Sequence, residues 1–311
     1  METKVYAGRI KDRDVLHYCS SGGAFTALSD VYLNGGGAVL CSGYNYSTHQ
    51  TEFRLVLTSA DRDSCRGSMY MQSCALDSWY QAEKWLVSNP DKKLIFFGVG
   101  CQGAAFLEYC NRKGIRHRVT IVDIICHGVP SPMIWKKYVE SFGKEKNLSD
   151  INFRDKRTGW NKSIGIAKVN GKEVSLSKWR QAYSKRVMLR PCCAFCPYTA
   201  IERKTDITIG DFWHLEKSMP EFFDDMGTSV FLVHTEKGLA LFEDIKDKLD
   251  WRESNTEDCW QLNLEKPTDH AETREEFWKN YHRKGINYVM EKYGTVSFVE
   301  KVKRKIRSLV H

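Results

Sequence analysis

Apolar and polar positions along the first third of the chain alternate between the spacing of strands and that of helices. Short apolar runs bounded by polar turn residues predict strands at residues 5–9, 38–42 and 53–57. Helical spacing predicts helices over 23–34 and 74–87, and three glycines at 35–37 end the first of them. The chain is therefore expected to mix both kinds of element from its beginning.

Residues 93–142 carry the clearest pattern. The segments KLIFFG and RVTIVDIIC predict buried strands, and QGAAFLEYC and SPMIWKKYVESF, which follow them in turn, predict helices. Strand, helix, strand, helix is the order of a parallel α/β layer. Each predicted strand leads into a loop with glycine and cysteine, at 98–102 and 126–130, and ligands of open α/β sheets bind beyond such strand ends. We expect these loops to face one site.

The second half of the chain adds a hairpin and a helical end. Asn170 and Gly171 lie at the centre of the alternating segment SIGIAKVNGKEVSL and predict a tight antiparallel turn. The other expected elements are helices at 178–189 and 239–248, strands at 206–210 and 229–233, and a polar helical region from 253 onward. The predicted fold class is α/β, with a mixed sheet, helices on its faces, a small antiparallel hairpin element and a helical C-terminal segment.

Composition and charge narrow the classes of function. With 311 residues, 42% of them hydrophobic, the chain can bury a large core without covalent cross-links. The net charge of +8 suits phosphates or an acidic carrier protein and is too diffuse to indicate nucleic acid; an ordinary basic surface explains it equally well. No apolar run has the length of a signal-peptide core or a membrane span, so we expect a cytoplasmic protein.

Eleven cysteines in a reducing compartment indicate metal, cluster or redox chemistry before disulfides. The segment RPCCAFCP places Cys193 and Cys196 three apart on a tight loop, and Cys-Pro also ends the ferredoxin ligand run. One loop cannot supply four ligands, so Cys101 in GVGCQG and Cys126 in ICHGVP, both at strand ends, are the further candidates. The remaining cysteines apart from Cys192 are expected to be ordinary buried residues: Cys19, Cys41, Cys65, Cys74, Cys110 and Cys259.

By number alone, four thiolates suit a 4Fe-4S cluster or a structural zinc ion equally. The spread of these cysteines along the chain favours iron, because structural zinc sites usually gather paired CxxC segments. Zinc and the absence of any metal remain the alternatives.

Two small-residue loops are candidates for binding a dinucleotide cofactor. CSSGGAFT leads directly into a helix, whose first N–H groups can bind a phosphate, and Ser20 or Ser21 can cap it. RGSMY offers a cation, a hydroxyl and an aromatic ring that can hold the phosphate or ring of a flavin. A plain helix cap and a surface turn are the alternative interpretations.

Three further features could take part in chemistry. His127 follows Cys126 and can exchange a proton near a flavin, although a lone histidine is more often structural. Asp211, in GDFW, leaves a strand beside aromatic residues that can wall a planar cofactor or simply pack a loop. In FRDKRTGW, cations beside Trp160 can bind an acidic substrate or cover the hairpin. The basic amphipathic segment 298–310 can contact an anionic membrane surface or a partner, or pack on its own domain.

Together these motifs resemble those of the coenzyme F420 hydrogenase/dehydrogenase beta-subunit family. They occur in the family's order from about Val5 to Val233, as SSGGAFTAL, RGSMYMQS, GVGCQGAAF, DIICHGVPSP, FRDKRTGW, RPCCAFC and RKTDITIGDFW. The resemblance implies an FAD-binding α/β protein with a 4Fe-4S cluster, which passes electrons between cluster and flavin to reduce or oxidise a small organic substrate. We expect the chain to divide into a flavin-binding part (1–90), an α/β part with the cysteine loop (91–250) and a helical tail (251–311).

The resemblance also assigns residues. The cluster ligands fall on Cys101, Cys126, Cys193 and Cys196, whereas Cys192 falls where the family usually has serine. The flavin-binding positions fall on Ser21, Gly22, Gly23, Thr26, Gly67, Ser68, Tyr70 and Gln72. Gly100, Gln102 and Asp211, at strand ends, are added as candidate cofactor-binding residues, and His127 is the candidate catalytic proton donor.

Two departures from the family pattern matter. Many relatives begin with a ferredoxin-like domain, and this chain starts directly at the strand before SSGG, so a separate ferredoxin or flavodoxin-like protein is expected as the electron donor. GVGCQ replaces GTPCQ, and the lost proline loosens the loop. The expected setting is a stand-alone reductase in surface-polysaccharide biosynthesis. The alternatives are a beta subunit acting on coenzyme F420 within a complex, a zinc-stabilised scaffold without catalysis, and a flavin-dependent sugar rearrangement without net redox change.

Overall fold

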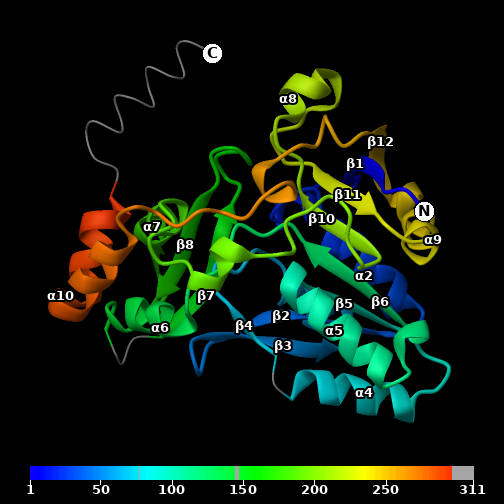
Figure 1. Cartoon of the computed structure of the whole chain (residues 1–311), viewed down its shortest axis with the longest axis horizontal. Coiled ribbons are helices and arrows are strands. Elements are labelled where there is room, and N and C mark those ends of the chain that lie inside the picture. Colours follow the sequence, from blue (N-terminus) through cyan, green and yellow to red (C-terminus); the bar gives the residue numbers. More distant parts are fainter. Residues whose placement is uncertain (76, 144–146, 296–311) are drawn as a thin grey trace.

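The computed structural model describes residues 1–75, 77–143 and 147–295, and within these ranges the chain forms a large mixed sheet and a small antiparallel one (Figure 1). In spatial order the strands of the large sheet are β12 (Leu249–Ser254), β1 (Lys4–Ile10), β11 (Ser229–Val233), β10 (Ile207–Asp211), β6 (Val119–Ile124), β5 (Leu94–Val99), β2 (Ala38–Asn45), β3 (Gln50–Val56) and β4 (Ser73–Cys74). The strands of the small sheet are β7 (Leu148–Asp155), β8 (Ile164–Val169) and β9 (Lys172–Ser175).

Helices connect most of these strands. They are α1 (Arg13–His17), α2 (Ala24–Asn34), α3 (Ser59–Asp63), α4 (Ser78–Ser88), α5 (Gly100–Arg112), α6 (Pro132–Glu140), α7 (Ser177–Ser184), α8 (Leu215–Ser218), α9 (Glu236–Ile245) and α10 (Arg274–Gly294). Short 3-10 turns lie at Arg116–Arg118, Pro191–Phe195, Pro220–Phe222, Lys246–Lys248 and Leu262–Leu264. Within the described ranges, no helix has both the length and the apolar character needed to cross a membrane.

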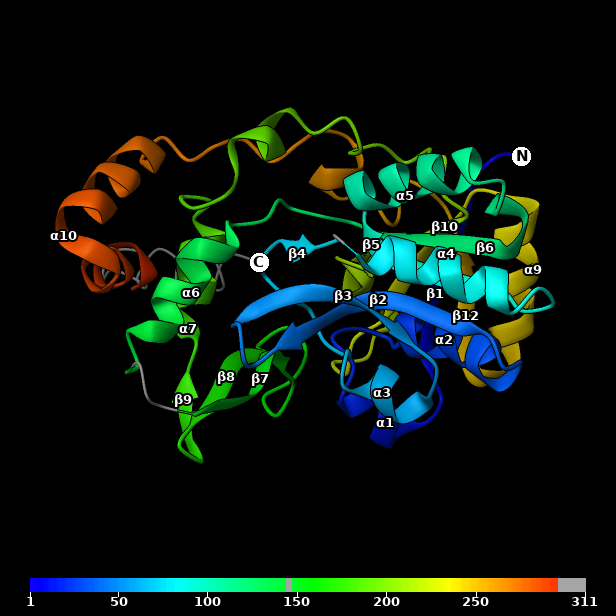
Figure 2. The same ribbon diagram turned by 90° about the horizontal axis from the view of Figure 1, so that it is seen from below.

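The middle of the large sheet is parallel and buried on both faces. β2, β5, β6 and β10 pair in parallel, and Leu94, Ile95 and Phe96 of β5 are fully buried, as two covered faces require. Helices α2 and α9 cover one face, and α4 and α5 cover the other (Figure 2). The parallel layer predicted from residues 93–142 is therefore confirmed, as is the fold class.

A second core lies between the small sheet and helices α6, α7 and α10. Trp135 of α6 and Trp179 of α7 pack edge to face with ring centres 4.8 Å apart. Trp135 Nε1 donates a hydrogen bond of 2.9 Å to the hydroxyl of Tyr44 in β2, which ties this core to the large sheet. The predicted hairpin is confirmed, since Asn170 and Gly171 both have the positive φ of a type I′ turn, 51° and 76°.

Several predicted boundaries are wrong. β5 passes directly into α5, so Cys101 lies in the first turn of a helix and not in a loop. α4 begins at Ser78, after β4, and α7 ends at Ser184, shortly before Arg186 takes a positive φ of 61°. Cys74, predicted to be buried, is exposed.

The region from Glu253 onward is not continuously helical. It begins inside β12, which pairs with β1, and it becomes helical only at Arg274 after an irregular stretch with one 3-10 turn. The polar sequence of β12 hides this strand, because it lies at the edge of the sheet. The predicted segment 298–310 lies outside the described residues, and the division of the chain at residues 90 and 250 stays a prediction.

Candidate functional site

The four predicted ligand cysteines come from three separate segments. Cys101 lies in the first turn of α5, and Cys126 follows the end of β6. Cys193 lies in the 3-10 turn Pro191–Phe195, and Cys196 is the residue that caps the end of this turn. A hydrogen bond from Arg190 N to Val129 O, 2.9 Å long, holds this turn against the segment after β6.

The thiols influence one another electrostatically. Burial raises the pKa of Cys126 to about 12, and negative charge on the other three cysteines adds to the rise. Burial likewise raises the pKa of Cys101 to about 11, with further contributions from Cys196 and Cys193. Such effects require short distances through a medium that screens poorly. The structure therefore brings the four thiols into one neighbourhood.

The donor chemistry of four thiols suits more than one group. In the described parts of the chain, no three His, Cys, Asp or Glu side chains are placed to hold a single metal ion. Thiolates are ligands of structural zinc and of iron-sulfur clusters, so the four cysteines suit both groups.

Gly128 is a residue of this site that the sequence reasoning missed. Its N–H donates to Cys126 Sγ at 3.3 Å, and a Cβ at this position would lie 3.1 Å from Cys193 Cβ. Its φ of 103° also favours glycine. Gly128 therefore allows Cys126 and Cys193 to approach each other. The available signal was its place two residues after Cys126 in the motif ICHG.

A buried ion pair lies near His127. Arg154 donates to Asp211 at 2.7 Å, and Trp160 Nε1 donates to the other carboxylate oxygen at 3.3 Å. The Arg154 guanidinium also faces the rings of Trp160 and Trp213. Burial lowers the pKa of His127, which Asp211 opposes and Arg154 reinforces. Asp211 thus neutralises Arg154, and Arg154 is not free to bind an acidic substrate as a lone cation.

Tyr70 connects this ion pair to the cysteines. Its ring stacks on that of Tyr183 with centres 4.7 Å apart, and the Tyr183 hydroxyl donates to Gly128 O at 3.0 Å. Burial lowers the pKa of Arg154, but Asp211 and then Tyr70 raise it above its usual value overall. The RGSMY loop, the small sheet and the cysteine segment therefore meet at Tyr70.

The glycines of the SSGG segment are needed for close packing. Gly22 N donates to Ser229 Oγ at 3.0 Å, and a Cβ on Gly22 would lie 2.5 Å from Ser229 N. Gly23 is the N-cap of α2, with a φ of 86°. Because no described side chain accepts a hydrogen bond at this cap, the first N–H groups of α2 are left for another acceptor.

The prediction that Ser20 or Ser21 caps α2 is wrong. Ser21 Oγ donates to Thr228 O at 2.9 Å, and Ser20 Oγ accepts from Ser68 N at 2.8 Å. Both hydroxyls are taken by distant parts of the chain, which local sequence cannot reveal. The contact with Ser68 nevertheless joins the two loops predicted to hold the flavin.

The other predicted cofactor positions in these loops lie in two places: Thr26 and Gly67 lie beside Arg66, and Gln72 lies near the cysteines. Arg66 Nε donates to the buried Thr26 Oγ1 at 3.2 Å, and Gly67 beside it has a φ of 102° with open space where a side chain would stand. Gln72 lies on the cysteine side, where its N–H donates to Pro130 O at 3.2 Å and its buried Oε1 has no partner among the described residues.

Gly100 and Gln102 hold the start of α5. Gln102 Oε1 accepts from Val99 N at 3.3 Å, and its amide donates to Ser73 O at 3.2 Å. A Cβ on Gly100 would lie 3.1 Å from a guanidinium nitrogen of Arg203, a further residue that the sequence reasoning missed. Arg203 pairs with the buried Asp123 at 3.2 Å, which places a compensated charge beneath this helix start.

Lys156 anchors the SSGG segment. Its buried ammonium donates to three carbonyls, Leu16 O at 2.6 Å, Ser21 O at 3.1 Å and Met226 O at 2.6 Å. Burial lowers its pKa to about 8. The lysine of FRDKRTGW therefore positions the backbone of three segments.

Comparison with known proteins supports the resemblance seen in the motifs. The family defined by the C terminus of the coenzyme F420 hydrogenase/dehydrogenase beta subunits matches residues 91–258, more than half of the chain. The chain belongs to this family. All four candidate cysteines, His127 and Asp211 lie in the matched part, and the SSGG and RGSMY loops precede it. The prediction of the F420 hydrogenase/dehydrogenase beta-subunit family is confirmed, and with it a hydrogenase/dehydrogenase type of oxidoreductase.

Among solved structures, the fold is similar to a chain of the F420-reducing NiFe hydrogenase complex from Methanosarcina barkeri, studied by xenon derivatization. The TM-score is 0.56 at 16% sequence identity, over 94% of this chain and 92% of that chain. At this identity the likeness shows the fold alone. None of the curated proteins compared with the chain matches it.

Proposed function

We propose that this protein is an iron-sulfur flavoprotein oxidoreductase that passes electrons between a 4Fe-4S cluster and FAD. The observation that carries the proposal is the convergence of four thiols from three segments, all within the part of the chain that the family model matches. Cys101, Cys126, Cys193 and Cys196 would hold the cluster, and their spread along the sequence favours it over zinc, whose structural sites usually gather paired CxxC segments. The N–H of Gly128, directed at Cys126 Sγ, would stabilise a ligated thiolate.

We propose that the flavin lies along the joined SSGG and RGSMY loops. The uncapped start of α2 can accept a phosphate, and Tyr70 offers a ring at the boundary with the cysteines. Ser21 Oγ donates to Thr228 O and Gly22 N donates to Ser229 Oγ, so these two groups would shape the loop and would not bond the flavin. Bound flavin supplies hydride and single-electron chemistry. His127 would exchange a proton with the flavin or substrate within electrostatic range of the Arg154–Asp211 pair.

A second candidate function is equally well supported. The family description and the similar fold of a hydrogenase-complex chain favour a beta subunit that works within a larger assembly, with coenzyme F420 as its substrate. Purification under native conditions separates the two, since only this second function requires a stable complex with a hydrogenase or dehydrogenase partner. For a stand-alone cytoplasmic enzyme, a ferredoxin or flavodoxin-like protein would be the electron donor, and the basic charge of the chain suits such acidic carriers.

The test of electron transfer is an anaerobic titration of the purified protein with dithionite, followed by absorbance. We expect the flavin and cluster bands both to bleach and to recover when an oxidant is added. A protein whose spectrum does not change would contradict the proposal. Turnover of a substrate without consumption of reductant would instead indicate a rearrangement, and a colourless protein with zinc would indicate a scaffold. The surface-polysaccharide setting stays part of this proposal, tested by the same assay on sugar-derived substrates.

A further inference from the structure

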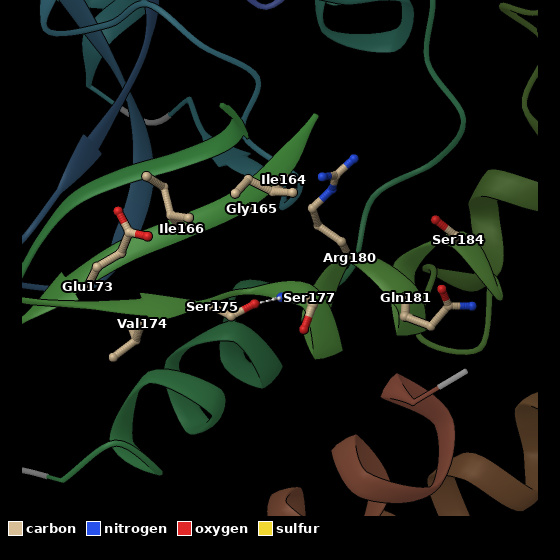
Figure 3. Close-up of a pocket in the computed structure, with 10 residues that line it drawn as sticks. All are labelled: Ile164, Gly165, Ile166, Glu173, Val174, Ser175, Ser177, Arg180, Gln181 and Ser184. Carbon is tan, nitrogen blue, oxygen red and sulfur yellow. Dashed lines mark hydrogen bonds between the residues drawn. The ribbon is translucent and has the colours of Figure 1, made fainter. Parts of the chain in front are cut away.

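A pocket of about 600 Å³ opens between the β8–β9 hairpin and helix α7 (Figure 3). Hydroxyl side chains line one part of it, from Ser175 and Ser177 at the start of α7 to Ser184 at its end. Arg180 extends from α7 across β8 toward Ile164. None of these residues belongs to the proposed cofactor site.

Packing against β8 and a hydrogen bond to the backbone hold the Arg180 side chain in place. A Cβ on Gly165 would lie 2.7 Å from Arg180 Cδ, so the arginine stem crosses β8 where only glycine leaves room for it. Its guanidinium donates to Ser163 O. Burial lowers the pKa of Arg180, Tyr70 opposes this and Arg154 reinforces it. The guanidinium therefore lies partly buried at the pocket, within electrostatic range of Tyr70 and Arg154.

The charge of Arg180 is not neutralised. Across the described ranges, no carboxylate forms an ion pair with it. The acidic residue of the pocket wall, Glu173, accepts two hydrogen bonds from Arg157, at 3.0 and 2.9 Å. Asp211 is paired with Arg154, which donates one hydrogen bond of 2.7 Å to it. A partly buried cation without a counter-ion is costly, and an anionic ligand relieves that cost.

We propose that this pocket binds the phosphate or carboxylate group of the substrate, with Arg180 as its charged donor and the serine hydroxyls as neutral ones. The inference rests on the proposed oxidoreductase function for the position of the reacting group. Because Arg180 lies near Tyr70 and Arg154, a molecule anchored there extends toward the proposed flavin site. The protein would then act on small molecules that carry an acidic group at one end and the reacting group at the other.

The test is a calorimetric titration of the purified full-length protein with inorganic pyrophosphate at constant ionic strength. We expect wild-type protein to bind it and Arg180→Gln to bind at least tenfold more weakly. Gly165→Ala, which displaces the arginine stem, should weaken binding in the same direction. Arg112→Gln, on the exposed side of α5, is the matched control and should bind like wild type.

Flavin content distinguishes the two sources of a phosphate group. We expect Arg180→Gln to retain as much FAD per chain as wild type. Loss of FAD would overturn the inference, because it would assign Arg180 to the pyrophosphate of the cofactor. Equal pyrophosphate binding by wild type and Arg180→Gln, or none by wild type, would overturn it as well. Since this titration needs no electron transfer, its failure is separate from failure of the dithionite titration.

Discussion

Arg154 and Asp211 form an ion pair of 2.7 Å that joins the two sheets, since Arg154 belongs to β7 and Asp211 ends β10. Both side chains are largely buried, with 8% and 16% of their surface exposed. Trp160 Nε1 donates a hydrogen bond to the second carboxylate oxygen of Asp211. The pair therefore fixes how the small sheet meets the large one beside His127.

We expect Asp211→Asn to lower the free energy of unfolding by about 3 kcal/mol, because it leaves the Arg154 charge buried without a counter-ion. Urea denaturation followed by circular dichroism measures this change. The control is Glu108→Gln, which removes the exposed partner of Arg112 and should change the free energy of unfolding little. An equal effect of both substitutions would show that the Arg154–Asp211 pair is no more important than a surface pair.

Gly128→Ala is expected to remove bound iron. The added Cβ would crowd Cys193, and the residue would be strained at its φ of 103°. Gly114→Ala is the matched control, since Gly114 also has a positive φ, 68°, but has open space around it. We expect both variants to lose some stability, and only Gly128→Ala to lose iron on analysis. Full iron content in Gly128→Ala would contradict the assigned place of Cys193.

His234 should make the protein less stable in mild acid. It is buried, with Thr3 and Thr208 hydroxyls at 3.0 and 2.8 Å from its ring nitrogens. Burial, and then the charge of Arg203, lowers its pKa to about 4, against about 6.5 in an unfolded chain. As the pH falls between these values, the unfolded chain takes up the proton first, so the stability contributed by His234 is lost in this window.

The measurement for His234 compares urea denaturation of wild type and His234→Gln at several pH values. We expect the difference in free energy of unfolding to shrink by about 3 kcal/mol from neutral pH down to the folded pKa. The subtraction removes the titration of all other groups. Parallel pH profiles for the two proteins would contradict a neutral buried imidazole.

The sequence predicts those parts of the fold whose pattern is local. β5 is a continuous apolar run because it is buried on both faces, and Asn170-Gly171 adopts the positive φ values that such a pair allows. β12 escaped prediction because an edge strand is half polar and its partner β1 lies far away in sequence. Local patterns cannot show such long-range pairing.

Local sequence likewise predicts only part of the candidate site. The motif positions of Cys193 and Cys196 are visible in sequence, but their approach to Cys126 depends on how Gly128 and the turn after Arg190 pack. The three carbonyls that surround Lys156 come from separate segments, so its sequence context gave no sign of an anchoring role. Arg180 was missed for the same reason, because its unpaired charge is known only once the neighbouring ion pairs are known.

The most direct measurement is the iron, zinc and FAD content of anaerobically purified wild type, Cys126→Ser and Cys192→Ser. We expect about four irons and one FAD per chain in wild type and in Cys192→Ser, whose exposed thiol lies outside the proposed ligand set. Cys126→Ser should lose most of its iron. Colourless wild-type protein with stoichiometric zinc and no flavin, or equal iron loss in both variants, would contradict the proposed cluster and its ligands.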